Sequence, residues 1–280
     1  MNQDLLKVFE TCLLCPGICN NKCPVYRKTH LRTAAPSVLG RLGTRIIREN
    51  RIDLAQGLRL CVECGLCLDA CPVKNPLPSA IQELKHIIYK IPGNIPEPIT
   101  LLEGDEKILL VSSTMPAQWI IDELREQGIG VLYLDSYEAR EQRSLYGSLG
   151  LPKDLKEKYK VYCEDYRLCP EFPSGLRLLL DYDLRPPKKP PAYSLLLPCG
   201  EDGKASYEEA VNVYGTPSAT IDVCGIPDLY LAGYEVYTRR LVKKLKEMRK
   251  GLFYLSPDSF TAKVLGSLLD APIVSPLSYR

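Results

Sequence analysis

The sequence has few histidines and no long hydrophobic run. Its two histidines, His30 and His86, lack the spacing of metal ligands, so a histidine-based metal site is not expected. No apolar stretch approaches the ~18 residues that a membrane-spanning helix needs. Asp4 and Glu10 stand where a signal peptide would carry lysines ahead of an apolar core. These absences predict a cytoplasmic protein without a membrane span, and peripheral association with a membrane through partners stays compatible with the sequence.

The sequence also lacks a strong charge bias and the common catalytic motifs. Its 36 Lys and Arg are nearly balanced by 34 Asp and Glu, which gives no reason to expect a nucleic-acid partner. It contains no Gly-x-Gly-x-x-Gly, no P-loop and no nucleophile–base constellation. Flavin-binding, nucleotide-binding and hydrolytic roles therefore lack support, and no catalytic residue is assigned.

Cysteine, in contrast, is abundant, with 12 residues in a chain of 280. A disulfide scaffold is typical of short secreted chains, and this chain is long and shows no export signal. Eight of the cysteines form two short runs that each end in Cys-Pro, which indicates metal ligation. They are Cys12, Cys15, Cys19 and Cys23 in the first run and Cys61, Cys64, Cys67 and Cys71 in the second.

The second run, from Cys61 to Cys71, has the spacing of a [4Fe-4S] ligand set. It reads C-x2-C-x2-C-x3-C-P, in which three thiolates bind one cubane and the fourth cysteine binds the other cluster. The first run has the same pattern with one extra residue between its second and third cysteines. Crossed ligation then predicts two clusters with four ligands each. The first would bind to Cys12, Cys15, Cys19 and Cys71, and the second to Cys61, Cys64, Cys67 and Cys23.

Two alternatives to a pair of [4Fe-4S] clusters stay open. Zinc also binds Cys-x2-Cys pairs, but one zinc site needs four ligands and the two runs offer eight. The residue inserted in the first run leaves open a [3Fe-4S] cluster there. Two crossed clusters would lie roughly 10–12 Å apart, a separation suited to rapid electron hopping.

Periodicity divides the chain into a helical part and an α/β part. Leu39, Leu42 and Ile46 recur at helical spacing, and residues 54–61 and 81–88 show similar stripes. Three prolines and a glycine in residues 91–100 interrupt regular structure. Beyond them, strands are predicted at 107–113, 130–135, 193–198 and 251–255, and helices at 119–127, 234–250 and 260–269.

This alternation predicts a two-part fold. We expect an all-α dicluster domain over residues 1–92, a linker over 93–101 and an α/β domain over 102–280. The sheet of the α/β domain should be mainly parallel. The stretches on either side of the proline-rich segment 185–191 are expected to be two weak repeats of one unit.

The helical sequence between the cysteine runs resembles the α-helical ferredoxins. These include the C subunit of heterodisulfide reductase, the iron–sulfur subunits of anaerobic glycerol-3-phosphate dehydrogenase and glycolate oxidase, and a domain of succinate dehydrogenase's iron–sulfur subunit. Besides both cysteine runs, the matching features are Pro24-Val-Tyr, Gly40-Arg-Leu-Gly and the helix after Cys71-Pro72. The resemblance covers about residues 5–90 and implies two clusters in a helical domain.

The second half resembles a degenerate Cys-Cys-Gly domain of the heterodisulfide reductase B type. Cys199 and Cys224 stand at two of the family's cysteine positions, whereas Ser256-Pro-Asp-Ser259 replaces its Cys-Pro-x-Cys. Hydroxyls are poor iron–sulfur ligands, so the resemblance implies a retained fold without the family's cluster. A third cluster on Cys163, Cys169, Cys199 and Cys224 stays open, as do buried or redox-active thiols.

The expected function is electron transfer within a multi-subunit oxidoreductase. The chain would relay single electrons between a flavin-containing dehydrogenase subunit and a quinone-linked, heterodisulfide-type or ferredoxin acceptor. Arg41, Arg45 and Arg48 share a helical face, which is either a solvated surface or a docking site for an acidic partner. The alternative function is an assembly or scaffold subunit with structural clusters and a partner-binding α/β domain.

Overall fold

The computed structural model describes two compact units. The described residues are 3–90, 96–146, 151, 153–165, 168–169, 171–187, 190, 192–197, 200–224, 226–231, 238, 243, 253–269 and 273–279. The first unit takes in the described residues of 1–93, 141–149 and 224–241, and the second takes in those of 94–140, 150–223 and 242–280. The first unit thus includes two stretches from the range that the sequence assigns to the α/β domain.

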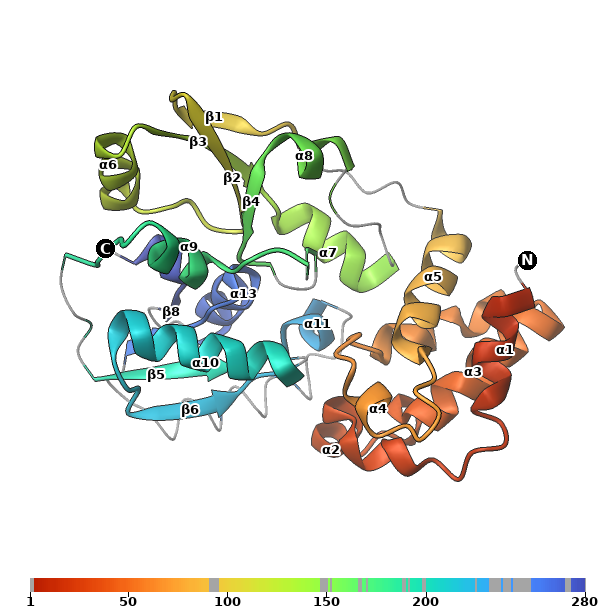
Figure 1. Ribbon diagram of the computed structural model, residues 1–280. Coiled ribbons are helices and arrows are strands. Elements are labelled where there is room, and N and C mark those ends of the chain that lie inside the picture. Colours follow the sequence, from red (N-terminus) through yellow and green to blue (C-terminus); the bar gives the residue numbers. More distant parts are fainter. Residues whose placement is uncertain are drawn as a thin grey trace. The chain divides into compact units, whose positions relative to one another are not determined.

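The first unit is helical around both cysteine runs, as predicted (Figure 1). The stripe at Leu39 and Ile46 lies in α3, where both side chains are buried. Residues 54–60 form 3₁₀ rather than α-helix, and Gly57 lowers the α-helical propensity in the middle of that segment. The elements are α1 (Gln3–Thr11), η1 (Ile18–Lys22), α2 (Pro24–Thr29), η2 (Arg32–Ala34), α3 (Pro36–Glu49), η3 (Ile52–Leu60), α4 (Leu66–Asp69) and α5 (Leu77–Tyr89).

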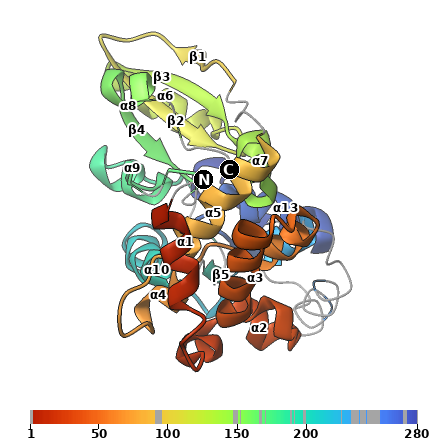
Figure 2. The same ribbon diagram turned by 90° about the vertical axis from the view of Figure 1, so that its right-hand side faces the viewer.

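Helices α1, α3 and α5 pack together around an apolar core (Figure 2). Phe9, Leu58, Ile81 and Leu84 are fully buried there. A Cβ atom on Gly43 would lie 2.2 Å from a ring carbon of Phe9. Glycine at this position therefore allows α1 and α3 to approach closely, which positions the cysteine that follows α1.

A short helix from late in the chain belongs to the first unit. It is α11 (Ile226–Leu231), and its buried Leu229 packs with Val25, Leu60 and Val62. The Lys28 ammonium donates a hydrogen bond to the carbonyl oxygen of Cys224 at 3.2 Å. The surface formed by α2 and the end of η3 is thereby covered by chain from the second half of the sequence.

The second unit contains two four-stranded sheets. The first has the order β1-β3-β2-β4 and the second the order β6-β5-β7-β8, and every pair except β1–β3 is parallel. This confirms the predicted α/β fold with mainly parallel sheets. The strands are β1 (Ile99–Leu102), β2 (Glu106–Ser112), β3 (Ile129–Asp135), β4 (Lys160–Cys163), β5 (Tyr193–Leu197), β6 (Ala219–Asp222), β7 (Phe253–Leu255) and β8 (Ile273–Val274).

The strand order supports the two weak repeats. In each sheet the first parallel strand, β2 or β5, lies between the two that follow it in the chain. Residues 99–101, which were expected in the linker, instead begin the antiparallel strand β1. Because Pro96 and Pro98 precede this edge strand, they remove no hydrogen bond from its ladder.

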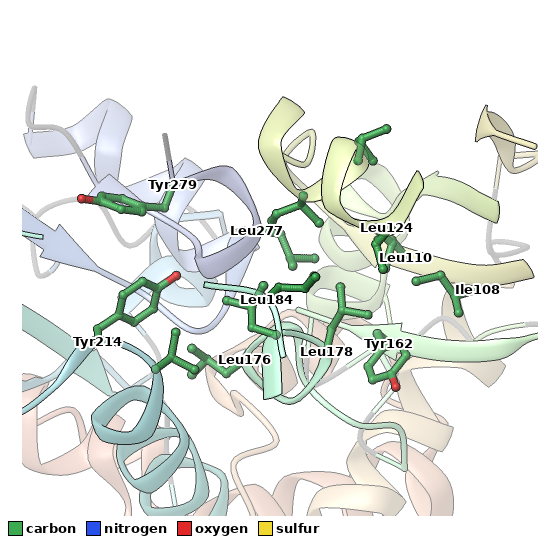
Figure 3. Packing of buried hydrophobic residues seen from close by; sticks show 14 of the residues in the cluster. Ile108, Leu110, Leu124, Tyr162, Leu176, Leu178, Leu184, Tyr214, Leu277 and Tyr279 are labelled. Atoms are coloured by element: carbon green, nitrogen blue, oxygen red, sulfur yellow. The ribbon is translucent and has the colours of Figure 1, made fainter. Parts of the chain in front are cut away.

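Helices and a shared core complete the second unit. Apolar side chains from both sheets and from α9 form one cluster, which includes Leu110, Tyr162, Leu178 and Tyr214 (Figure 3). The predicted helices at 119–127 and 260–269 are present, whereas most of the helix predicted at 234–250 lies outside the described residues. The helices are α6 (Gln118–Glu126), α8 (Lys153–Lys158), α9 (Gly175–Asp181), α10 (Gly200–Tyr214) and α13 (Ser259–Leu269). Helix α7 (Tyr137–Tyr146) begins in the second unit, and its residues from 141 on belong to the first.

In the described part of the chain, no helix is long and apolar enough to span a bilayer.

Candidate metal centres

The eight cysteines of the two runs lie in the first unit with free thiols. Cys12 follows α1, and Cys23 directly precedes Pro24, the first residue of α2. Cys61 follows η3, and Cys67 lies within α4. The Cys-Pro pair at 23–24 thus fixes a helix start, because proline is favoured in the first turn, where its missing N–H is not needed.

A cavity of ≈ 400 Å³ lies among the cysteines of the first run. Cys12, Cys15 and Cys19 line it together with Cys71, the last cysteine of the second run. Its remaining lining residues are Thr11, Leu14, Pro16, Ile18, Cys67, Pro72, Val73, Asn75 and Leu77.

A second, smaller cavity lies among the cysteines of the second run. Cys61, Cys64 and Cys67 line it together with Cys23, the last cysteine of the first run. Cys67 therefore borders both cavities. Each cavity is lined by three cysteines of one run and the last cysteine of the other, with Cys67 as a fifth cysteine at the first cavity. Each cavity therefore offers the four sulfur donors that a cubane cluster needs.

Backbone and side-chain N–H groups point at several of the sulfurs. The Asn75 amide nitrogen Nδ2 donates to Cys12 Sγ at 3.3 Å and to the Val8 carbonyl at 2.9 Å. The backbone N–H of Asn75 donates to Cys71 Sγ, and that of Gly17 donates to Cys15 Sγ, both at 3.4 Å. N–H···S bonds of this kind stabilise a thiolate and tune the potential of a cluster that it binds.

Gly17 accommodates the residue inserted in the first run. Its φ of 83° lies in the left-handed region, where glycine has no steric penalty. The turn at Pro16-Gly17 therefore keeps Cys15 and Cys19 on the same cavity although they are four residues apart.

Burial opposes thiolate formation in both cavities. It raises the pKa of the Cys12 and Cys23 thiols to about 11 and the pKa of Cys61 to about 12. It also raises the pKa of Cys19 and of Cys67. Iron that binds to these thiols must therefore displace their protons. Among the described residues, no three His, Cys, Asp or Glu side chains converge closely enough to hold a single metal ion.

A buried lysine supplies positive charge beside the second cavity. Lys85 of α5 is 0% exposed, and its ammonium donates to the Cys61 carbonyl at 3.3 Å and to Glu63 Oε1 at 3.0 Å. Its charge opposes the effect of burial on the pKa of Cys61. Lys85 and Asn75 were not singled out from the sequence, because neither belongs to a cysteine motif.

Gly40 of the Gly40-Arg-Leu-Gly segment lies directly against Cys12. A Cβ atom at this position would be 2.3 Å from Cys12 Cβ and 2.9 Å from its sulfur. The glycine therefore makes room for Cys12 at the edge of the first cavity.

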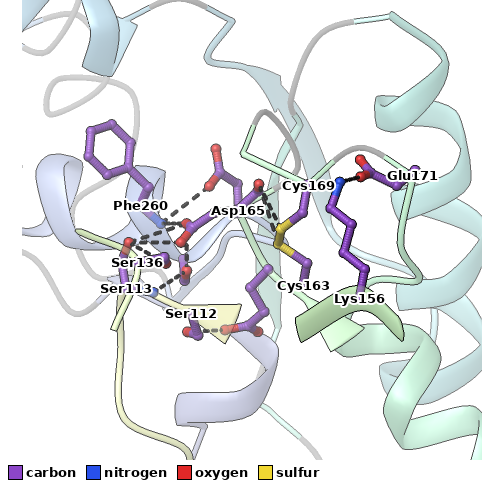
Figure 4. The surroundings of a disulfide bond; sticks show 12 residues. Ser112, Ser113, Ser136, Lys156, Cys163, Asp165, Cys169, Glu171 and Phe260 are labelled. Carbon is purple, nitrogen blue, oxygen red and sulfur yellow. Dashed lines mark hydrogen bonds and ion pairs between the residues drawn. A yellow bond between two sulfur atoms is a disulfide. The ribbon is translucent and has the colours of Figure 1, made fainter. Parts of the chain in front are cut away.

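The four remaining cysteines do not form a set of free thiols. Cys163 and Cys169 are bonded to each other, and Cys224 is also disulfide-bonded (Figure 4). Cys199 lies outside the described residues. In this state three of the four cysteines are not available as thiolate ligands for the third cluster that the sequence left open.

Serines and carboxylates meet at the ends of the strands in the second unit. Ser113 and Ser259 both donate to Asp165, at 3.0 Å and 2.9 Å, and Ser112 donates to Glu164 at 2.8 Å (Figure 4). We refer to these five residues as the serine–carboxylate cluster. The resemblance to the Cys-Cys-Gly pattern drew attention to Ser259, but it did not reveal the two acids with which the serines form hydrogen bonds.

Both acids of the serine–carboxylate cluster are fully buried. Burial raises the pKa of Glu164 to about 8, although the N–H of Leu277 and the hydroxyl of Ser112 donate to its oxygens. Burial and the nearby charge of Asp258 raise the pKa of Asp165. The cluster lacks free thiols, so it fits a hydrogen-bonded core better than an iron–sulfur site.

The segment that carries both cysteine runs matches a known family. Residues 8–75 match the family model described as "4Fe-4S dicluster domain". These residues are therefore similar to a 4Fe-4S dicluster domain. This confirms the predicted iron–sulfur character of the first unit, and the domain contains all eight cysteines of the two runs.

Two curated relatives are C subunits of heterodisulfide reductases. The C subunit of the ferredoxin/F(420)H(2)-dependent CoB-CoM heterodisulfide reductase of Methanosarcina acetivorans is 32% identical over 109 residues, which are 35% of this chain and 61% of the relative. The C subunit of the ferredoxin:CoB-CoM heterodisulfide reductase of Methanosarcina mazei is 32% identical over 102 residues, 32% of this chain and 56% of the relative. The chain thus spans about three fifths of the relatives it matches. No solved structure matches the chain.

Proposed function

We propose that this protein is an iron–sulfur electron-transfer subunit of a larger oxidoreductase complex. The observation that carries the proposal is the pair of cavities within residues 8–75, each lined by at least four cysteines drawn from both runs. Cys12, Cys15, Cys19 and Cys71 would bind the first cluster. Cys61, Cys64, Cys67 and Cys23 would bind the second.

The donor sets favour [4Fe-4S] at both positions. A [3Fe-4S] cluster at the first run would leave one of Cys12, Cys15, Cys19 and Cys71 unused, whereas a cubane uses all four. Once bound, each cluster supplies one-electron redox chemistry. The protein holds the sulfurs in place, donates N–H groups from Asn75 and Gly17, and holds the Lys85 ammonium near the second cluster.

The proposed partners follow from the relatives' names. Both relatives are named as subunits of heterodisulfide reductases that depend on ferredoxin, one of them also on F(420)H(2). We infer that this chain likewise works in a hetero-oligomer, between a flavin-containing dehydrogenase subunit or ferredoxin and a quinone-linked or heterodisulfide-type acceptor. Its location would be cytoplasmic, with contact to a membrane only through partners.

The test is anaerobic iron and sulfide quantitation, followed by EPR during a reductive titration. About eight irons per chain and two interacting reducible S = 1/2 centres are expected. About four irons, or clusters that do not reduce in a physiological range of potentials, would contradict electron transfer through two clusters and would favour a scaffold role.

Serine variants test the crossed ligands. Cys71→Ser should alter the EPR signal of the cluster at the first run, and Cys23→Ser should alter that of the other cluster. Cys169→Ser is the matched control, because Cys169 lies in a disulfide of the second unit, and its iron content should equal that of the unaltered chain. If Cys71→Ser changed only the signal of the second run's cluster, the crossed assignment would be wrong.

A further inference from the structure

The two cavities differ in their access to solvent. Leu14, Ile18 and Val73 line the first cavity and are nevertheless 93%, 56% and 69% exposed. The second cavity is lined by buried side chains such as Leu39 and Ile81. Surfaces that carry several exposed large apolar side chains around a functional centre are typical of binding sites.

One side of the second cavity is covered by the chain itself. Leu229 of α11 is 1% exposed and belongs to the apolar cluster against which Cys23 and Cys64, two of the cysteines that line this cavity, are packed. The first cavity is therefore the one through which a partner can approach a cluster closely.

The sequence around the first cysteine run is basic. Residues 11–48 contain Lys22, Arg27, Lys28, Arg32, Arg41, Arg45 and Arg48 and no Asp or Glu, and of these Arg45 and Arg48 pair with Glu49 and Glu10. Lys22 ends the 3₁₀ turn that begins with Ile18, and the exposed Lys74 follows Val73. A binding site with an apolar centre and basic flanks is complementary to a partner with an apolar patch and acidic flanks.

We propose that Leu14, Ile18 and Val73 form the docking surface for an acidic electron-transfer protein. This inference rests on the proposed function and names the side from which electrons are exchanged. The docked partner's redox centre and the first cluster exchange one electron, so that one of them is oxidised as the other is reduced. A second copy of this chain would bring the same basic residues against the surface, and like charges oppose that pairing.

The test uses the full-length chain with both clusters and an acidic plant-type ferredoxin as the probe. Stopped-flow absorbance measures how fast the reduced ferredoxin reduces the chain at about 0.01 M and about 0.15 M ionic strength. We expect Leu14→Glu with Val73→Glu to slow this reaction at least about tenfold, and Lys22→Glu with Arg41→Glu to slow it similarly and to weaken its salt dependence. Ile52→Glu is the matched control, because Ile52 is 55% exposed on η3 and does not line the cavity.

Two readouts separate this inference from the proposed function. Iron content and the rate of reduction by titanium(III) citrate should be unchanged in the variants, because this small reductant needs no docking surface. If the clusters of the unaltered chain were not reduced by titanium(III) citrate, the proposed function would fail. If they were reduced, two results would each refute the docking surface. One is a rate of reduction by ferredoxin that does not fall as the salt concentration rises. The other is an equal rate in the Leu14→Glu/Val73→Glu variant and in Ile52→Glu.

A lipid surface is the competing occupant of this face. Sedimentation with vesicles that contain anionic lipid tests it. The proposal would be overturned if the Leu14→Glu/Val73→Glu variant no longer bound the vesicles but was reduced by ferredoxin at an unchanged rate. The face would then be assigned to a membrane. If loss of iron accompanied the glutamate pair, Leu14→Gln and Lys22→Glu would provide the same comparison without two charges beside the cavity.

Discussion

Removing the buried ammonium beside the second cavity should lower the reduction potential of the cluster proposed there. Lys85 Nζ lies 3.3 Å from the Cys61 carbonyl oxygen. Since the carbonyl oxygen and the sulfur of one cysteine are about 4 Å apart, the ammonium lies within roughly 7 Å of the Cys61 sulfur. At an effective dielectric constant of about 20, a unit charge at this distance contributes about 2.4 kcal/mol to the binding of one extra electron.

This energy corresponds to a shift of about 100 mV, because 59 mV is equivalent to about 1.4 kcal/mol for a one-electron couple. Glu63 remains after the change, and the positive charge of Arg143, 4.0 Å away, offsets its negative charge and so reduces the effect. We therefore expect Lys85→Met to lower the midpoint potential of the second cluster by about 50–100 mV. The assay is a redox titration followed by EPR, in which the potential of the first cluster should change far less.

The control for this prediction is Lys7→Met, which makes the same chemical change at an exposed site on α1. It should leave both potentials within about 20 mV of the unaltered chain, because exposed charges are screened. An unchanged second potential in Lys85→Met, a rise in it, or equal shifts of both clusters would refute the electrostatic argument.

Three further predictions concern the rest of the chain. Gly40→Ala should displace Cys12 and lower the iron content from about eight to about four per chain. Gly57→Ala is the control and should leave the iron content unchanged, because its methyl group would meet only the end of the Leu42 side chain. The free energy of unfolding of the second unit should fall as the pH rises from about 5 to about 8, and calorimetry measures it. The reason is that the pKa of Glu164 is raised from 4.5 to about 8, so that in this range the folded chain keeps a proton that the unfolded chain has lost. An unchanged pH dependence in Glu164→Gln would contradict this prediction. Reduction of the Cys163–Cys169 disulfide should lower the free energy of unfolding of the second unit by about 2–3 kcal/mol. Cys169→Ser should have the same effect. Thiol labelling verifies the reduction, and thermal denaturation measures the loss of stability.

The sequence predicted the parts of the fold whose residues carry local signals. Continuous apolar runs at 107–113 and 193–198 became central parallel strands, and the stripe through Leu39 and Ile46 became α3. The short strands β1, β4, β6 and β8 were missed, because two to four residues are too few to show a period. Whether the domain extends over residues 1–92 stays a prediction.

The assignment of the eight cysteines as cluster ligands stays a prediction, and the residues that surround them could not be predicted. Ligand spacing is a local property, so both cysteine runs could be recognised in the sequence. Lys85, Asn75 and α11 reach the cysteines from elsewhere in the chain, and no spacing rule connects residue 85 with residue 61 or residue 229 with residue 23. The serine–carboxylate cluster was missed for the same reason, because its residues come from the ends of different strands.

The exchange of the fourth cysteines between the two runs makes each proposed cluster a covalent tie across the dicluster domain. Cys71 would be tied to the first run across about 50 residues, and Cys23 to the second run across about 40. By the loop-entropy relation used for disulfides, each tie lowers the conformational entropy of the unfolded chain and so stabilises the folded chain by about 4 kcal/mol. Oxidative loss of one cluster would then release α1 or α2 from the rest of the domain. The protein would thus become susceptible to proteolysis at the moment when it lost its ability to carry electrons, so that damaged copies would be removed before they could occupy a complex.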